Sequence, residues 1–395
     1  MTTNEIKALN EKHVINTYGS RSIAFVRGEG VTLWDAEGKE YLDFFAGIAV
    51  AGLGHCHPKV TEALCMQAKT LVHVSNLYYI EPQVKLAALL CQHSFADKWF
   101  FSNCGAGAME AAMKLARRYW SQQGTPRPEF VTMLQSFHGR TFGAISATGQ
   151  PKYQEGFEPL LPGIRHVPFD DMGALRKALS PQTGAVIVEP IQGEGGVRVP
   201  ANDYLKQVRA LCDERGALLI LDEVQTGVGR TGKFFAHEHY GITPDIIVVA
   251  KGLGNGVPIG AMGCTDKVAS GFSVGSHAST FGGNPLCTAA ALATVEIILE
   301  PGFLPHVEQI GAYFLEKLNV LAKKHAGIAQ VRGKGLLIGV EMKTPVAPVV
   351  QKMLDSGIVC GPAGPNVLRF APPLIITQQH VDRVVATLDK AIGEV

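Results

Sequence analysis

The stretch ALLILDEVQTGVGRTG, residues 217–232, starts with five apolar residues and continues with two carboxylates, Asp222 and Glu223, an amide and three glycines. A short apolar run followed by turn residues predicts a buried strand. An ionised carboxylate at the end of such a strand loses hydration, so it needs a cation, a proton or solvent. Asp222 therefore either caps a turn, as most aspartates after strands do, or faces a cation supplied from elsewhere in the fold.

Similar apolar runs occur at 98–102, 130–134, 185–189 and 246–250. Helix formers with apolar residues at helical spacing lie between several of these runs. The clearest cases are 108–120 and 203–216, the second of which ends at Gly216, a suitable helix C-cap. Strands that alternate with helices predict an α/β fold with a mostly parallel sheet that is covered on both faces.

The pattern changes near residue 286, where longer helical segments follow (286–299, 308–325 and 380–395) with a strand-like stretch at 336–342. We expect a smaller α+β domain there. Near the N-terminus, alternating runs at 31–35 and 41–45 flank the turn Ala36–Gly38, which predicts a hairpin that packs against this smaller domain. We therefore expect an N-terminal segment (1–45), a large domain (46–285) and a small C-terminal domain (286–395).

The composition indicates which kinds of molecule the protein binds. Lys and Arg number 36 and Asp and Glu 35, a net charge of +1, and no basic run suggests a surface for nucleic acid. No apolar stretch reaches the roughly 20 residues of a membrane helix, and the first 14 residues lack the apolar core of a signal peptide. The eight cysteines show no C-x-x-C spacing, so neither a zinc cage nor a disulfide framework is expected. These features favour a cytoplasmic protein that binds small molecules and no metal.

We expect the catalytic and binding residues to follow the strands directly, because ligands of parallel sheets bind beyond the carboxyl ends of the strands. Polar and glycine-rich segments stand there: 103–106, 137–140, 189–196, 222–225 and 251–252. Lys251 directly follows five apolar residues. On this feature alone it is an ordinary lysine that leaves a strand. A lysine partly removed from water can, however, attack an aldehyde as a free amine. Pyridoxal phosphate needs such an amine together with a carboxylate that keeps its pyridine nitrogen protonated, and Asp222 would then face that cation.

Two more features fit the same cofactor. In SNCGAGAMEAA, residues 102–112, Gly105 and Ala106 stand where a loop enters a helix, and free N–H groups at a helix start bind phosphate. Many helices start with glycine for packing alone. Phe137 could stack on a cofactor ring or lie in the core. The combination of amine, carboxylate, phosphate cradle and ring platform is more specific than any one of them.

Two rival motifs are weaker. GFSVG, residues 271–275, matches the G-x-S-x-G elbow of serine hydrolases, but neither a strand before it nor a helix after it is predicted. His55-Cys56-His57 could bind a metal, yet the flanking Gly54 and Pro58 are typical of a turn and no second cluster is present.

Nine blocks together carry a resemblance over nearly the whole chain: GIAVAGLGHCHP, SFHGRT, GQPKY, EPIQGEGGV, LDEVQTGVGRTG, TPDI, AKGLGNGVPIGA, GSHASTFGGNP and NVLRFAPPL. In content and order they resemble the class III aminotransferases of the ornithine/acetylornithine type. The resemblance implies a fold-type I pyridoxal phosphate transferase, with a mostly parallel seven-stranded sheet in the large domain. It also implies a homodimer whose active sites are shared between subunits.

The resemblance assigns cofactor contacts by position. Lys251 would bond to the cofactor aldehyde and carry the proton, and Asp222 would hold the pyridine nitrogen; these are the two expected catalytic residues. Gln225 would contact the ring hydroxyl. The remaining expected cofactor contacts are Val224 and Phe137 on the ring, Gly105 and Ala106 on the phosphate, and Thr280 on the phosphate across the dimer interface.

The resemblance also assigns substrate contacts. Arg140 would bind the substrate α-carboxylate, while Arg369 would alternate between Glu194 and the second substrate. The implied reaction, a step of arginine biosynthesis, moves the terminal amino group of N2-acetylornithine to 2-oxoglutarate, giving N-acetylglutamate 5-semialdehyde and glutamate. Succinylornithine, ornithine, succinyl-diaminopimelate and 4-aminobutyrate remain alternative donors, and a non-catalytic pyridoxal phosphate-binding protein remains a second class.

One block departs from the family pattern. Where the family usually has Ser-Gly-Ala-Glu-Ala-Asn-Glu, this chain has CGAGAME at 104–110. Cys104 replaces a hydroxyl and Met109 replaces an amide. Gly107 lowers helix stability by up to about 1 kcal/mol relative to alanine. We expect these changes to affect the start of the helix and the affinity for cofactor.

Overall fold

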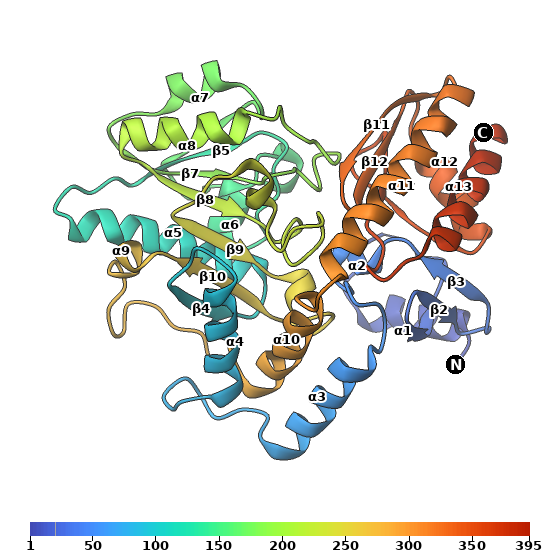
Figure 1. Cartoon of the computed structure of the whole chain (residues 1–395), viewed down its shortest axis with the longest axis horizontal. Helices are drawn as coiled ribbons and strands as arrows, with labels where there is room; N and C mark the ends of the chain where they lie inside the picture. Colours follow the sequence, from blue (N-terminus) through green and yellow to red (C-terminus); the bar gives the residue numbers. More distant parts are fainter. Residues whose placement is uncertain (20) are drawn as a thin grey trace.

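The computed structural model describes residues 1–19 and 21–395, and these form one seven-stranded sheet and two four-stranded sheets (Figure 1). The seven strands lie in the order β4 (Lys98–Ser102), β10 (Gly260–Cys264), β9 (Ile246–Val249), β8 (Leu218–Asp222), β7 (Thr183–Val188), β5 (Glu129–Met133) and β6 (Ile164–Val167). Only β10 runs antiparallel to its neighbours in this sheet. The predicted mostly parallel α/β sheet of seven strands is therefore confirmed.

Both faces of this sheet are covered, as its apolar strands require. In β8, Leu218 and Ile220 pack with the helix α5 (Gly105–Gln122), whereas Leu219 and Leu221 pack with α8 (Tyr204–Arg215). This alternation follows from the two-residue period of a strand. As predicted, α8 ends at Gly216, whose φ of 63° lies in the left-handed region that glycine adopts without strain.

Five of the seven strands coincide with the predicted apolar runs, and β6 and β10 were missed. The sequence of β10 is GAMGC, which has no long apolar run. Its glycines are required by close neighbours: a Cβ at Gly260 would lie 2.2 Å from the carbonyl oxygen of Cys104, and one at Gly263 would lie 2.8 Å from the Trp99 ring. Close backbone approach is a common reason for glycine inside a strand.

The second sheet joins the two ends of the chain. Its strands are β1 (Phe25–Glu29), β2 (Thr32–Asp35), β3 (Glu40–Asp43) and β13 (Ile358–Val359). The predicted hairpin is present, because β2 and β3 pair antiparallel, and β3 pairs in parallel with β13. Figure 1 shows this sheet beside the C-terminal helices, and Leu42 and Phe44 share a core cluster with residues of α11 and α13.

The third sheet has the order β11 (Ile328–Lys334), β12 (Leu337–Met342), β15 (Val367–Phe370) and β14 (Gly361–Pro362). Helices α11 (Phe303–Lys324), α12 (Ala347–Asp355) and α13 (Gln378–Gly393) pack around it. Helix α10 (Pro285–Ile298) instead packs with α3 (Pro58–Thr70), α4 (Glu81–Gln92) and one end of the large sheet. The domain boundaries after residues 45 and 285 stay a proposal.

The shorter helical segments connect these layers: α1 (Thr3–His13), α2 (Ala46–Ala49), α6 (Phe142–Ala147), α7 (Met172–Ala178), α9 (Asp266–Ala269), η1 (Pro151–Tyr153), η2 (Ala236–Tyr240) and η3 (Lys251–Leu253). Within the described residues, no single helix has the length and apolar character to cross a membrane, although α10 and α11, bent by 71° at their junction, meet those criteria as a pair.

Candidate active site

A cavity of about 470 Å³ opens where the carboxyl ends of the central strands meet the start of α5. It collects expected site residues from five separate segments of the chain. Those that line it are Gly105, Ala106, Phe137, Arg140, Glu194, Asp222, Val224, Gln225 and Lys251. Parallel strands bring their following loops to one sheet edge, so this convergence is what the strand pattern predicts.

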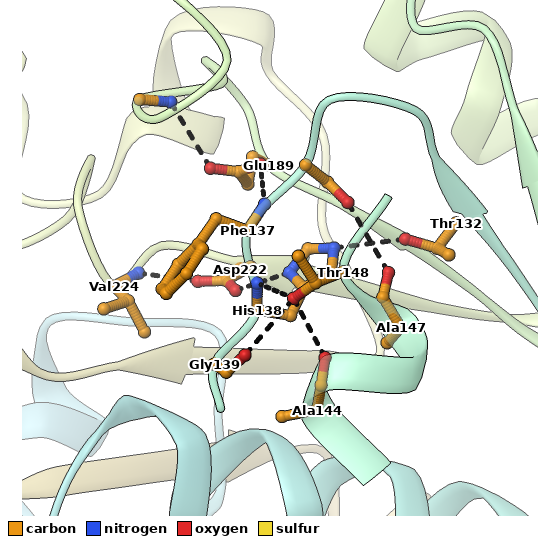
Figure 2. A network of polar contacts seen from close by, with 12 residues as sticks. Thr132, Phe137, His138, Gly139, Ala144, Ala147, Thr148, Glu189, Asp222 and Val224 are labelled. Carbon is orange, nitrogen blue, oxygen red and sulfur yellow. Dashed lines mark hydrogen bonds and ion pairs between the residues drawn. The ribbon is translucent and has the colours of Figure 1, made fainter. Parts of the chain in front are cut away.

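Asp222 has a partner inside the protein. Its Oδ2 lies 2.7 Å from Nδ1 of His138, and its Oδ1 accepts the backbone N–H of Val224 at 3.0 Å (Figure 2). An ionised carboxylate can only accept, so Nδ1 of the imidazole donates. On the far side of the ring, Nε2 lies 3.1 Å from Oγ1 of Thr132. His138 was not assigned a role from the sequence, although it follows Phe137 directly in SFHGRT.

Lys251 begins η3 immediately after β9 and Ala250, at a φ of 42°. A non-glycine residue rarely adopts this left-handed conformation, which marks the position as constrained by its surroundings. Removal from bulk water lowers the pKa of the amine, the negative charge of Glu194 opposes this effect, and the positive charge of Arg369 adds to it. The net effect is a pKa below that of an exposed lysine, so the amine loses its proton more readily.

Glu189 is a second buried acid that sequence reasoning did not single out. It is 5% exposed, lines the cavity, and accepts the backbone N–H groups of Phe137 at 3.2 Å and Gly193 at 3.3 Å. Burial raises the pKa of its carboxyl well above the usual range, and the nearby charge of Asp222 raises it further. Glu189 could have been found from the sequence, because it is the last residue of the apolar run AVIVE and so stands where a strand is predicted to end.

The start of α5 faces the cavity through Gly105 and Ala106. The N–H groups of a first helical turn have no acceptor within the helix, which suits an anion. A Cβ at Gly105 would lie 2.9 Å from Cγ2 of Val224, so glycine permits the close approach of these two segments.

The unusual residues of this segment have structural roles. The sulfur of Cys104 accepts the N–H of Gly107 at 3.5 Å and so caps the helix. A Cβ at Gly107 would lie 3.2 Å from Cβ of Ser102, so this glycine relieves a crowded contact. Met109 is fully buried in the core that α5 shares with the sheet.

Arg369 lies outside the lining of this cavity but contacts two residues that belong to it. It is 1% exposed on β15, and its guanidinium meets Oε1 of Glu194 at 2.5 Å and Oε1 of Gln225 at 3.1 Å. The amide nitrogen of Gln225 also donates to Oε1 of Glu194 at 3.3 Å. Burial raises the pKa of Glu194, but the charge and hydrogen bond of Arg369, with smaller contributions from Lys251 and Gln225, hold the pKa below its usual value.

Arg140 and Thr280 are placed differently. The guanidinium of Arg140 lies 3.9 Å from the ring centroid of Tyr153 and 5.7 Å from that of Phe137, at the mouth shared with an outer cavity of about 610 Å³. Thr280 is exposed and does not line either cavity of this single chain. The rival hydrolase motif, residues 271–275, lies in the loop after α9 without a preceding strand or an immediately following helix.

The family described as aminotransferase class-III matches residues 15–392. The chain is 49% identical to the acetylornithine aminotransferase of Caldanaerobacter subterraneus subsp. tengcongensis over 98% of each chain. Among solved structures, it is similar to the ornithine aminotransferase from Toxoplasma gondii ME49, at a TM-score of 0.96 and 34% identity over 100% of this chain and 96% of that one. The acetylornithine aminotransferase from Elizabethkingia anophelis superposes with a TM-score of 0.89 and 32% identity over 100% of both chains.

Proposed function

The chain belongs to the class-III aminotransferases, a pyridoxal phosphate-dependent family, and we propose that it moves the terminal amino group of N2-acetylornithine to 2-oxoglutarate. The products would be N-acetylglutamate 5-semialdehyde and glutamate. The observation that carries this proposal is the meeting of Lys251, Asp222 and the start of α5 in one cavity, beside the Glu194–Arg369 pair. The donor is proposed from the acetylornithine aminotransferases among the relatives.

The residues of the cavity fit pyridoxal phosphate. The first turn of α5, at Gly105 and Ala106, offers N–H groups to a phosphate, and Phe137 and Val224 line the same cavity and would contact the ring. Lys251 would bond to the aldehyde. When bound, the cofactor supplies an electron sink for the carbon that exchanges its amino group.

The protein would control charge and protons around that carbon. Asp222, oriented by the N–H groups of His138 and Val224, would keep the pyridine nitrogen protonated. Lys251 Nζ, whose pKa is lowered chiefly by burial, would accept a proton from the substrate carbon and return it at the neighbouring position. Arg140 would bind a substrate carboxylate at the cavity mouth.

Glu194 and Arg369 would distinguish the two substrates. The reacting carbon of the donor carries no carboxylate, whereas that of 2-oxoglutarate does. With Glu194 in place, the charge of Arg369 is neutralised; when Glu194 moves away, Arg369 can bind a carboxylate. Leaving a charge unpaired for the wrong substrate is an effective means of discrimination.

A homodimer that completes the site with Thr280 is part of the proposal. Asn76 donates to the carbonyl oxygen of Ser279, so the segments around these residues are in contact. Large apolar side chains are exposed on both segments: Leu77 is 86% exposed, Tyr79 100% and Phe281 60%. Exposed apolar groups of this size favour a protein interface. A cytoplasmic location is proposed with it. Sedimentation of the wild-type protein tests the dimer, and loss of cofactor affinity in Thr280→Ala tests the shared site.

A donor panel with 2-oxoglutarate tests the reaction. We expect N2-acetylornithine to give the highest kcat/KM, with succinylornithine, ornithine, succinyl-diaminopimelate and 4-aminobutyrate as the alternatives. A visible absorbance that borohydride removes would indicate bound cofactor. If that absorbance were present without turnover of any donor, the chain would be a cofactor-binding protein and the proposed reaction would be rejected.

A further inference from the structure

Three strands of the third sheet, β11, β12 and β15, place Arg332, Gly339 and Arg369 in one row across the sheet. Arg332 of β11 is paired with Gly339 of β12, and Gly339 is paired with Arg369 of β15. Directly paired residues of antiparallel strands lie on the same face of a sheet. Gly339, which has no side chain, therefore lies between the two arginines, with Arg332 on one side and Arg369 on the other.

The loop Gly193–Val197, which carries Glu194, lies on this row. Arg332 donates from Nε to the carbonyl oxygens of Gly196 at 3.1 Å and Val197 at 3.0 Å, and from a terminal nitrogen to Gly196 at 2.7 Å. The other terminal nitrogen donates to Glu341 and Gln330. The side chain of Arg332 is 15% exposed. A planar fork with donors on both sides is suited to two adjacent carbonyls.

Gly339 gives the loop room to reach the sheet. A Cβ at Gly339 would lie 2.9 Å from Cβ of Val197, closer than real Cβ atoms approach. Val197 is fully buried and has a φ of 49°, and Gly196 has a φ of 106°. A valine in the left-handed region persists only where its surroundings impose the conformation.

We propose that Arg332 is a positioning residue that sets the discrimination between substrates, by fixing the loop so that the Glu194 carboxylate reaches Arg369. This inference rests on the proposed function. Glu194 is two residues before the first carbonyl that Arg332 binds, and both arginines belong to one sheet. With the backbone of the loop held, Glu194 exchanges partners by side-chain rotation alone. With the backbone released, its ion pair with Arg369 is populated less often.

The variant that tests this is Arg332→Lys, which keeps the positive charge beside Glu341 but cannot donate to both carbonyls from a rigid fork. The matched control is Arg127→Lys. Arg127 also donates to two consecutive carbonyls, those of Arg215 and Gly216, but on the surface away from the cavity.

The first measurement is the ratio of half-reaction rates with N2-acetylornithine and with glutamate. In Arg332→Lys we expect this ratio to fall about fivefold or more, because Arg369 is unmasked toward glutamate. Arg127→Lys leaves the ratio unchanged. In a Glu194→Ala background, Arg332→Lys adds no further change, because the carboxylate that it positions is gone. An unchanged ratio in Arg332→Lys, or an equal additional change in the Glu194→Ala background, would overturn the proposal.

The second measurement needs no turnover. Glutarate, a dicarboxylate without an amino or keto group, must compete with Glu194 for Arg369. Calorimetry should therefore show tighter glutarate binding to Arg332→Lys than to wild type, by about fivefold or more. Gly339→Ala, which displaces Val197 while keeping Arg332, should act in the same direction. Equal glutarate affinity in wild type and both variants would refute the positioning role even if the amino donor proved to be a different compound.

Discussion

His138 and Asp222, 84 residues apart in the sequence, form a buried contact in which Nδ1 and Oδ2 are 2.7 Å apart. The contact orients the carboxylate that ends β8 and leaves its charge at the edge of the cavity. His138 is itself held by Thr132 and Thr148, as Figure 2 shows. The carboxylate of Asp222 at the end of β8 is thus hydrogen-bonded by the protein and held in one orientation.

Asp222→Asn should retain bound cofactor but lower kcat by about a hundredfold or more, because an amide cannot keep the pyridine nitrogen protonated. Thr132→Val, which removes only the outer hydrogen bond to His138, should lower kcat by less than about tenfold. Steady-state rates and the cofactor spectrum of both variants check this. A wild-type rate in Asp222→Asn would leave Asp222 as a turn residue only.

Lys251→Ala should lower the rate by at least about a thousandfold, because it removes both the amine that bonds to the cofactor and the proton carrier. Circular dichroism should show an intact fold. Lys267→Ala, a change on the exposed helix α9, serves as the control and should be fully active. A kcat near the control value would exclude the proposed role of Lys251.

Glu194→Ala should expose Arg369 permanently and speed the half-reaction with glutamate relative to that with N2-acetylornithine. We expect a change of about tenfold in this ratio, which corresponds to about 1.4 kcal/mol. Single-turnover rates with each donor measure it, and Glu62→Ala on the surface of α3 is the control. If the ratio matched that of the control, the ion pair with Arg369 would be a static structural contact.

Glu189 should make stability depend on pH. Burial, with the charge of Asp222, raises the pKa of this carboxyl in the folded protein above its value in the unfolded chain. Between these two pKa values the folded state binds more protons, so the free energy of unfolding decreases as pH rises, by up to about 1.4 kcal/mol per unit of pH.

Glu189→Gln removes this titration. Urea denaturation at several pH values from 4.5 upward should show that the stability of the variant relative to wild type increases with pH until the folded-state pKa is passed. A difference that stayed constant over this range would mean that Glu189 titrates with the same pKa in both states.

Cys104→Ser should stabilise the start of α5 by up to about 1 kcal/mol, because serine is a preferred N-cap residue and its oxygen is the stronger acceptor. Chemical denaturation of the cofactor-free protein measures this gain. Cys65→Ser, at an exposed thiol on α3, should have no comparable effect. No gain in Cys104→Ser would mean that the thiol already caps the helix as well as a hydroxyl does.

Sequence patterns predicted the parts of the molecule that local physics determines. The five apolar runs became strands, and Gly216 ended α8. The residues after parallel strands gathered in one cavity, so Lys251 and Asp222 could be singled out before the structure. The strands β6 and β10 carried no such signal. Two of the five residues of β10 are glycines, and their close neighbours come from other segments. Arg369, inside the short strand β15, could be connected to Glu194 only through family resemblance.

The sequence by itself determined the strand and helix types, the apolar faces and the segments that meet at the sheet edge, because these depend on side-chain hydrophobicity and on conformational preferences within a few residues. Only the tertiary structure decided which groups are partners: His138 with Asp222, Glu189 with the backbone N–H of Phe137, and Arg332 with the loop that carries Glu194. Hydrogen bonds and ion pairs depend on distances of about 3 Å between atoms. Those distances are set when packed sheets bring together residues that are tens to hundreds of positions apart, and local sequence does not specify them.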